Sequence, residues 1–117
     1  MSVVFITGVT GFLGRHVAIR MLRRENLDQL LCLVRCDDAD HGHARILKSL
    51  SEVIPEEQAR ALAPKLRALP GDLCDEGLGL SDEDRDLLVT TATAVLHCAA
   101  DVRFNQDLED ARLRNVF

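Results

Sequence analysis

Residues 5–16 read FITGVTGFLGRH and contain three evenly spaced glycines: Gly8, Gly11 and Gly14. The apolar, β-branched run VVFIT at residues 3–7 precedes the glycines and is typical of a strand buried on both faces. Beyond them, apolar residues recur at helical spacing, which predicts a helix over residues 12–24. Glycine in an element interior costs roughly 0.5–1 kcal/mol relative to alanine, so three glycines at this spacing need a physical reason.

A strand, a glycine-rich turn and a helix form the setting in which a dinucleotide pyrophosphate binds at a helix N-terminus. We expect Gly8 to allow the tight turn and Gly11 to let backbone N–H groups approach the phosphates. Gly14 would let the helix pack closely against the sheet. The spacing GxxGxxG differs from the generic GxGxxG fingerprint, so taken alone it also fits an ordinary glycine turn. The flanking strand and helix are what indicate a dinucleotide site.

The rest of the chain continues to alternate apolar strands with amphipathic helices. We expect strands at 30–34, 65–69 and 93–100, and helices at 43–54, 55–63, 82–90 and 106–116. Strands that alternate with helices indicate right-handed βαβ units and a parallel sheet. The expected fold is therefore α/β: a Rossmann-like doubly wound parallel sheet, here partial, with four strands in the order 3-2-1-4.

Composition narrows the classes of function. The net charge is -5 and no basic face dominates, which argues against a nucleic-acid partner. No apolar run reaches the length of a membrane span, and Ser2 leads straight into the first strand without a signal peptide. The four cysteines form no CxxC pair, which favours reduced thiols and a cytoplasmic location. The acidic, histidine-containing segment at 37–43 lacks calcium-loop spacing, so we expect no metal site there.

The residue that follows the second strand bears on the type of dinucleotide. A nicotinamide-binding fold reads the adenosine ribose roughly 20 residues past the glycines, with an acid for NAD or an arginine for NADP. Arg35 stands at that point and predicts NADP, and Arg15 could reach the same phosphate. If the strand runs two residues longer, Asp37 or Asp38 becomes the ribose acceptor and the cofactor is NAD.

Several segments resemble a known family when taken in order. VFITGVTGFLGRHV, LCLVR, LPGDL, LGLSDED, VLHCAADVRF and LRNV are similar to the extended short-chain dehydrogenases/reductases. Within that superfamily the chain resembles the branch of fatty acyl-CoA reductases and thioester reductase domains. TGxTGFLG is shared with sugar-nucleotide epimerases and dehydratases. The helical insert after LVR, together with GDL…LGLS and AADVRF, points to the acyl-thioester branch.

The resemblance implies a set of cofactor contacts. These are Thr10, Gly11, Phe12 and Leu13 for the phosphates, Arg35 with Arg45 as a second candidate for the 2′-phosphate, Asp72 and Leu73 for the adenine, and Ala99 and Ala100 for the nicotinamide-side ribose. Asn115 falls where family members have an asparagine near the catalytic centre. Alternatively, Asp72 caps the turn after the third strand, and Ala99 and Ala100 are core packing. We expect His97 to be a buried, hydrogen-bonded histidine rather than a base.

The chemistry of the family needs a tyrosine and a lysine in the pattern YxxxK. The sequence contains no tyrosine, and its only lysines are Lys48 and Lys65. The fourth strand would also form an apolar sheet edge, which a further strand normally covers. We therefore expect residues 1–117 to be the N-terminal part of a single NADP-binding Rossmann domain, inactive alone, whose remainder carries YxxxK.

The expected intact protein is an NADPH-dependent reductase that converts acyl thioesters, held on CoA or a carrier protein, to aldehyde or alcohol. Two alternatives stay open. One is a sugar-nucleotide epimerase or dehydratase of the same superfamily, which would favour NAD. The other is a non-catalytic dinucleotide-binding module.

Overall fold

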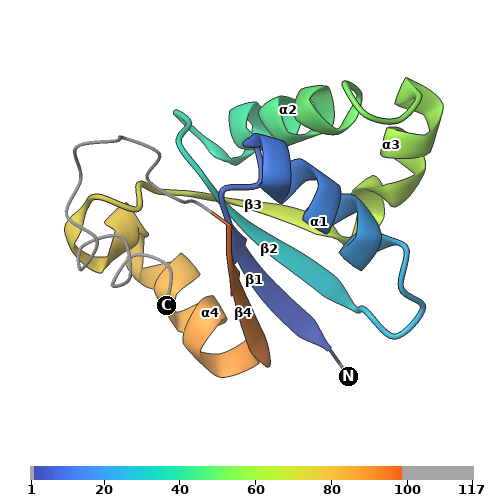
Figure 1. Cartoon of the computed structure of the whole chain (residues 1–117). Coiled ribbons are helices and arrows are strands. Elements are labelled where there is room, and N and C mark those ends of the chain that lie inside the picture. Colours follow the sequence, from blue (N-terminus) through green and yellow to red (C-terminus); the bar gives the residue numbers. More distant parts are fainter. Residues whose placement is uncertain (1, 99–117) are drawn as a thin grey trace, which may run out of the picture.

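The computed structural model describes residues 2–98 and shows strands and helices in alternation (Figure 1). The elements, in chain order, are β1 Val3–Thr7, α1 Phe12–Leu22, β2 Gln29–Val34, α2 Ala39–Leu50, α3 Glu56–Leu62, a short 3-10 turn η1 Ala63–Lys65, β3 Leu66–Pro70, a second 3-10 turn η2 Glu76–Gly79, α4 Asp82–Thr91 and β4 Ala94–His97. The helix expected over 106–116 lies outside the described residues.

The four strands form one parallel sheet in the order β3-β2-β1-β4. Thr7, the last residue of β1, is in register with Leu33 of β2 and with His97 of β4. Val34 of β2 is in register with Pro70 of β3. The carboxyl ends of all four strands therefore meet at one edge of the sheet, and the expected strand order 3-2-1-4 is confirmed.

Helices cover both faces of the sheet, as a doubly wound fold requires (Figure 1). Alternate residues of β1 point to opposite faces, so that Val4 and Ile6 join one core and Val3 and Phe5 the other. The first core is built with α1, α2 and α3, and includes Ala18, Leu22, Ile46, Leu50 and Ala59. The second is built with β3 and α4, and includes Leu31, Leu33, Leu69 and Leu80, with Leu87 and Leu88 packed against them.

Helix α2 begins earlier than its apolar pattern predicts. The expected helix covers 43–54, whereas α2 starts at Ala39 and ends at Leu50. Asp38 is its N-cap, and the Asp38 carboxylate accepts a hydrogen bond from the His41 N–H at 2.7 Å. The polar segment expected to be a loop or helix cap therefore forms the cap and the first turn of α2. A Cβ on Gly42 would lie 2.8 Å from Val34 Cγ1, so glycine is what allows α2 to lie this close to the sheet.

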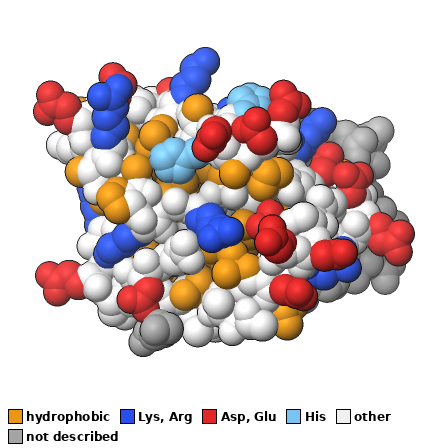
Figure 2. Space-filling model, turned by 180° about the vertical axis from the view of Figure 1, so that it is seen from behind, with side chains coloured by type: hydrophobic (Ala, Val, Ile, Leu, Met, Phe, Trp, Pro, Cys, Tyr) orange, Lys and Arg blue, Asp and Glu red, His pale blue; other side chains and the backbone are white. Residues whose placement is uncertain are grey.

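Other boundaries also differ from the expectation. Helix α1 ends at Leu22, and Pro64 lies inside the 3-10 turn η1 rather than simply ending α3. Strand β4 covers Ala94–His97 of the strand expected over 93–100, whose last two residues are not described. β4 is an edge strand among the described residues, and Val95 on it is 52% exposed. On the face seen in Figure 2, acidic, basic and hydrophobic side chains are interspersed.

Candidate cofactor site

The glycine turn joins the end of β1 to the start of α1. Gly8 has φ 77°, in the left-handed region that favours glycine, and the Gly11 N–H donates to the Gly8 carbonyl at 3.0 Å to close the turn. A Cβ on Gly14 would lie 1.7 Å from the Gly8 oxygen, a distance that no packed structure tolerates. Gly14 therefore lets α1 approach the backbone of the turn, whereas the sequence suggested close packing against the sheet.

The N-terminus of α1 differs from those of α2 and α4. Its N-cap, Gly11, makes no side-chain cap, and its first turn holds no acidic residue. In α2 and α4, the side chains of Asp38 and Ser81 accept from the third N–H group of the helix. The first N–H groups of any helix lack intrahelical partners and carry its positive dipole end. In α1 this end therefore suits an anion.

Gly11 also leaves space beside the N-terminus of α1. A Cβ on Gly11 would lie only 3.3 Å from the Gly8 oxygen. Phe12 and Leu13 are 78% and 60% exposed, so the first turn of α1 lies at the surface of the protein. These features fit a pyrophosphate bound by backbone groups.

Three adjoining cavities extend from the glycine turn across the carboxyl ends of β2 and β3. One of about 280 Å³ is lined by residues that include Gly8, Thr10, Asp72 and Leu73. A larger one of about 750 Å³ lies beyond Arg35 and Asp72, and a third of about 330 Å³ lies between Thr10 and α2. Arg45 lines all three cavities, and Arg35 lines two. The structure thus brings together Thr10, Arg35, Arg45, Asp72 and Leu73 around these cavities. Gly11, Phe12 and Leu13, also expected at the phosphates, line none of the three.

Arg35 contacts two other candidate cofactor-binding residues, Asp72 and Arg45. Its Nε lies 3.3 Å from Asp72 Oδ2, and its side chain is 78% exposed. The Arg45 guanidinium donates to the Arg35 backbone carbonyl. Asp72 Oδ1 accepts from the Cys74 N–H at 3.0 Å, which is the turn cap expected as the alternative role of this residue. Asp72 therefore caps its turn and also faces the cavities.

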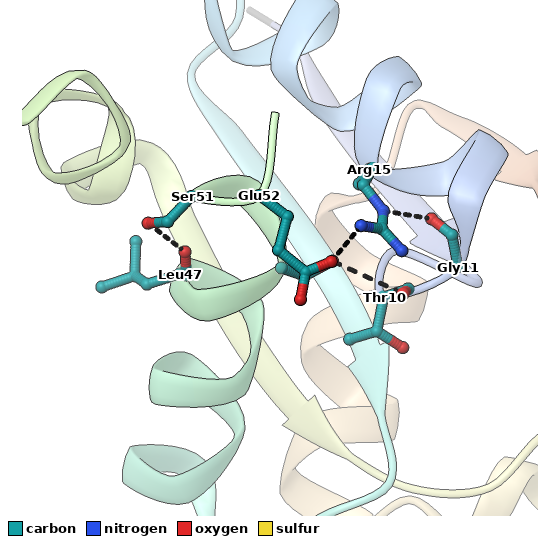
Figure 3. A network of polar contacts seen from close by, with 7 residues as sticks. Thr10, Gly11, Arg15, Leu47, Ser51 and Glu52 are labelled. Atoms are coloured by element: carbon teal, nitrogen blue, oxygen red, sulfur yellow. Dashed lines mark hydrogen bonds and ion pairs between the residues drawn. The ribbon is translucent and has the colours of Figure 1, made fainter. Parts of the chain in front are cut away.

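Arg15 makes contacts that its position in the sequence does not reveal (Figure 3). Its Nε donates to the Gly11 carbonyl at 3.2 Å, and its guanidinium pairs with Glu52, just beyond α2. Ser49 Oγ of α2 donates to the Thr10 carbonyl at 3.4 Å in the same place. These contacts fasten the start of α1 and the glycine turn to α2. Nothing in the sequence pattern around Glu52 indicates this role.

His97 links the ends of β1 and β4. Thr7 Oγ1 and His97 Nδ1 lie 2.6 Å apart, which confirms the expected hydrogen bond, but His97 is half-buried rather than buried. Burial lowers the pKa of His97 below its usual value. Its Nε2 is buried and has no hydrogen-bond partner among the described residues. The sequence analysis did not single out Thr7. Its side chain links the end of β1, directly before the glycine turn, to the end of β4.

The remaining expected residues are placed as follows. Ala99, Ala100 and Asn115 lie outside the described residues. The Asp37 side chain is exposed and its Oδ2 lies 3.8 Å from His41 Nδ1, while Asp38 caps α2. All four cysteines are free thiols, and burial raises the pKa of Cys32, Cys36 and Cys98.

Residues 2–98 contain neither a metal-binding cluster nor a membrane-spanning helix. No cluster of three or more His, Cys, Asp or Glu side chains in this range is arranged to hold a metal ion. Within the same range, no helix has both the length and the apolar character needed to cross a membrane.

Comparison with known proteins identifies the family. The family model described as male sterility protein, NAD_binding_4, matches residues 6–117. The chain belongs to this family. It is 38% identical over 116 residues to the PKS-NRPS hybrid synthetase cheA of Chaetomium globosum, covering 98% of the chain and 2% of that protein. It is 36% identical over 118 residues to fatty acyl-CoA reductase 1 of Xenopus laevis, covering 97% of the chain and 23% of that protein.

Solved structures agree with these relatives. The terminal R domain of the myxalamid PKS-NRPS pathway has a TM-score of 0.80 and 32% identity, covering 99% of this chain and 29% of that one. The reductase domain of a non-ribosomal peptide synthetase from Mycobacterium tuberculosis has a TM-score of 0.77 and 33% identity, covering 87% of this chain and 25% of that one. The resemblance to the thioester reductase branch of the extended short-chain dehydrogenases/reductases is therefore confirmed. The chain spans less than a third of each of these four relatives.

Proposed function

We propose that this chain is the cofactor-binding part of an NADPH-dependent reductase that converts acyl thioesters to aldehyde or alcohol. Arg35 and Arg45, joined by a hydrogen bond at the end of β2 beside the glycine turn, carry the proposal. An arginine pair next to an uncapped helix N-terminus suits a dinucleotide with an additional phosphate on its ribose. The relatives named above as reductases support the class of reaction.

In this proposal the chain's own residues bind and orient the dinucleotide. Backbone groups of Thr10, Gly11, Phe12 and Leu13 hold the pyrophosphate, and Asp72 and Leu73 flank the adenine. The nicotinamide, when bound, supplies the hydride that reduces the thioester carbonyl. Ala99 and Ala100 beside the ribose, and Asn115 near the catalytic centre, remain predictions from the resemblance.

The 2′-phosphate is assigned to Arg35 and Arg45 on the basis of their surroundings. The Arg35 side chain is 78% exposed beside the cavity of about 750 Å³, and Arg45 lines the same cavity. Arg15 would reach the phosphate only by leaving Glu52 and the Gly11 carbonyl. Asp38 is already used as the cap of α2, which weighs against its role as a ribose acceptor for NAD.

The catalytic tyrosine and lysine are proposed to lie elsewhere in the full-length polypeptide. The sequence has no tyrosine, so the YxxxK chemistry of the family cannot come from residues 1–117. The share of the fatty acyl-CoA reductase that the chain covers, 23%, is what a cofactor-binding part of a larger enzyme would cover. The acyl carrier, CoA or a carrier protein, is the expected partner.

The experiment is an assay of the purified full-length protein with acyl-CoA and with carrier-bound acyl thioester. We expect NADPH oxidation that depends on the thioester and yields aldehyde or alcohol. Turnover of a sugar nucleotide without external reductant would instead identify an epimerase or dehydratase. Dinucleotide binding with no turnover of either substrate class would identify a binding module.

A further inference from the structure

Arg35 is restrained at both its backbone and its side chain. The Arg45 guanidinium donates to the Arg35 carbonyl, which anchors the end of β2 to α2. The Asp72 carboxylate, just beyond β3, holds the Arg35 side chain through Nε at 3.3 Å. Three elements of the fold therefore converge on this one arginine.

The contact between Arg35 and Asp72 leaves the far side of the guanidinium available. It uses Nε, and none of the described residues bonds to the two Nη groups. These groups carry four N–H donors in a planar fork that matches the oxygens of a phosphate. Arg35 therefore lines two of the cavities with both Nη groups unbonded to the described residues, while its Nε is paired with Asp72.

We propose that Asp72 is a positioning residue that orients Arg35 for the 2′-phosphate, and so strengthens the preference for a phosphorylated ribose. This inference rests on the proposed function. The family resemblance places Asp72 beside the adenine, and in this structure its carboxylate has two further partners: Cys74 N–H at Oδ1 and Arg35 at Oδ2. A long arginine side chain loses rotamer freedom when it binds, and the ion pair removes part of that loss in advance.

The carboxylate of Asp72 also repels a phosphate. This repulsion weakens phosphate binding, whereas the orientation of Arg35 by Asp72 strengthens it. Both side chains are reached by solvent, with 78% exposure for Arg35 and 29% for Asp72, so water and salt screen the repulsion. The contact between Asp72 and the Arg35 guanidinium acts over a shorter distance, so screening weakens it less than it weakens the repulsion between Asp72 and the phosphate. An exposed ion pair of this kind corresponds to a change of about two- to five-fold in affinity.

The test uses the full-length protein and two probes, adenosine 2′,5′-bisphosphate and adenosine 5′-monophosphate. The ratio of their dissociation constants isolates recognition of the 2′-phosphate from recognition of the adenine. Asp72→Ser keeps a hydroxyl that can accept from the Cys74 N–H but is too short to hold Arg35. We expect the ratio to fall about two- to five-fold in Asp72→Ser, and less in Asp72→Asn, which keeps an uncharged acceptor.

Arg35→Gln provides the matched background, because Asp72 acts through Arg35. In that background, Asp72→Ser should leave the ratio unchanged. An unchanged or increased ratio in Asp72→Ser with Arg35 present overturns the inference, as does an equal loss for both probes, which indicates an adenine contact or a structural role alone. If Asp72→Ser does not fold, Asp72→Asn decides in the same way. A wild-type protein that binds both probes equally contradicts the proposed NADP specificity instead.

Discussion

The contact between α1 and the glycine turn depends on single glycines. A Cβ on Gly14 would lie 1.7 Å from the Gly8 oxygen and 2.5 Å from the Gly8 carbonyl carbon, both backbone atoms that cannot rotate away. Gly14→Ala should therefore lower the free energy of unfolding by about 3 kcal/mol or more, because the whole helix must shift. Urea unfolding of the purified protein measures this loss.

Gly11→Ala is the matched control for Gly14→Ala. Its Cβ would lie 3.3 Å from the Gly8 oxygen, which a small shift relieves, and Gly11 has φ −81°, which alanine adopts. We expect Gly11→Ala to keep most of the stability and to weaken dinucleotide binding, since the new methyl group narrows the phosphate cradle. Equal stability of the two variants would contradict the described packing of α1 on the turn.

His97 gives the protein a pH-dependent contribution to stability. Its pKa in the fold lies below the ordinary value of 6.5, so at intermediate pH the unfolded chain binds the proton more readily than the folded chain. The stability that depends on neutral His97 is therefore complete above about pH 6.5 and is lost as the pH falls through the lowered pKa.

The prediction is tested by unfolding at about pH 7.5 and about pH 5.5. His97→Gln should reduce the loss of stability between these two pH values relative to the wild type. If His97→Gln loses as much stability between the two pH values as the wild type does, groups other than His97 cause the loss.

Residue roles were predictable where the constraint is local. The need for glycine at position 8 follows from the turn directly after a buried strand, and the structure gives it a positive φ. Pairings between distant residues were not predictable: Arg15 and Glu52 are 37 positions apart, and Thr7 and His97 are 90 apart. Each of these pairs depends on which strands and helices become neighbours after folding.

At the scale of the elements, the start of α2 depends on its cap. Asp38 accepts from the His41 N–H at 2.7 Å, whereas the side chain of the adjacent Asp37 is 97% exposed and its Oδ2 lies 3.8 Å from His41 Nδ1. Asp38→Ala should lower the free energy of unfolding by about 1 kcal/mol because the first turn of α2 loses its cap. Asp37→Ala should change it by less than about 0.5 kcal/mol.

Thermal or urea unfolding of both variants checks this expectation. If Asp37→Ala is the more destabilising of the two, the assigned cap is wrong, and the NAD alternative based on Asp38 regains support. The comparison therefore also bears on which residues at the end of β2 remain available for the cofactor.

The elements differ in how well their sequence predicts them. Strands β1 and β2 are continuous apolar runs, and their positions and order were predicted to within a residue. Helix α2 was placed four residues late because the segment Asp37–His43 is polar and contains Gly42, features of a loop when read alone. Only the close packing of α2 on Val34, Cys36 and Ala68 explains why glycine suits that helix position.

At the scale of the whole molecule, the parallel sheet sets the location of the site. Parallel strands place the glycine turn, Arg35 and Asp72 at one edge, although these residues come from three separate parts of the sequence. This general location could be predicted from the βαβ pattern. The arrangement of cavities and the two contacts that fix Arg35 could not, since they depend on side-chain packing between α2 and the loop after β3.

The central claim is tested most directly by titrating the full-length protein with NADPH and, separately, with NADH. A charge-assisted contact between arginine and phosphate contributes about 1.5–3 kcal/mol, so NADPH should bind roughly 10- to 100-fold more tightly. Arg35→Gln should remove most of that difference while leaving NADH binding nearly unchanged. Equal affinity of the wild-type protein for the two dinucleotides would contradict the assignment of Arg35 and Arg45 to a 2′-phosphate.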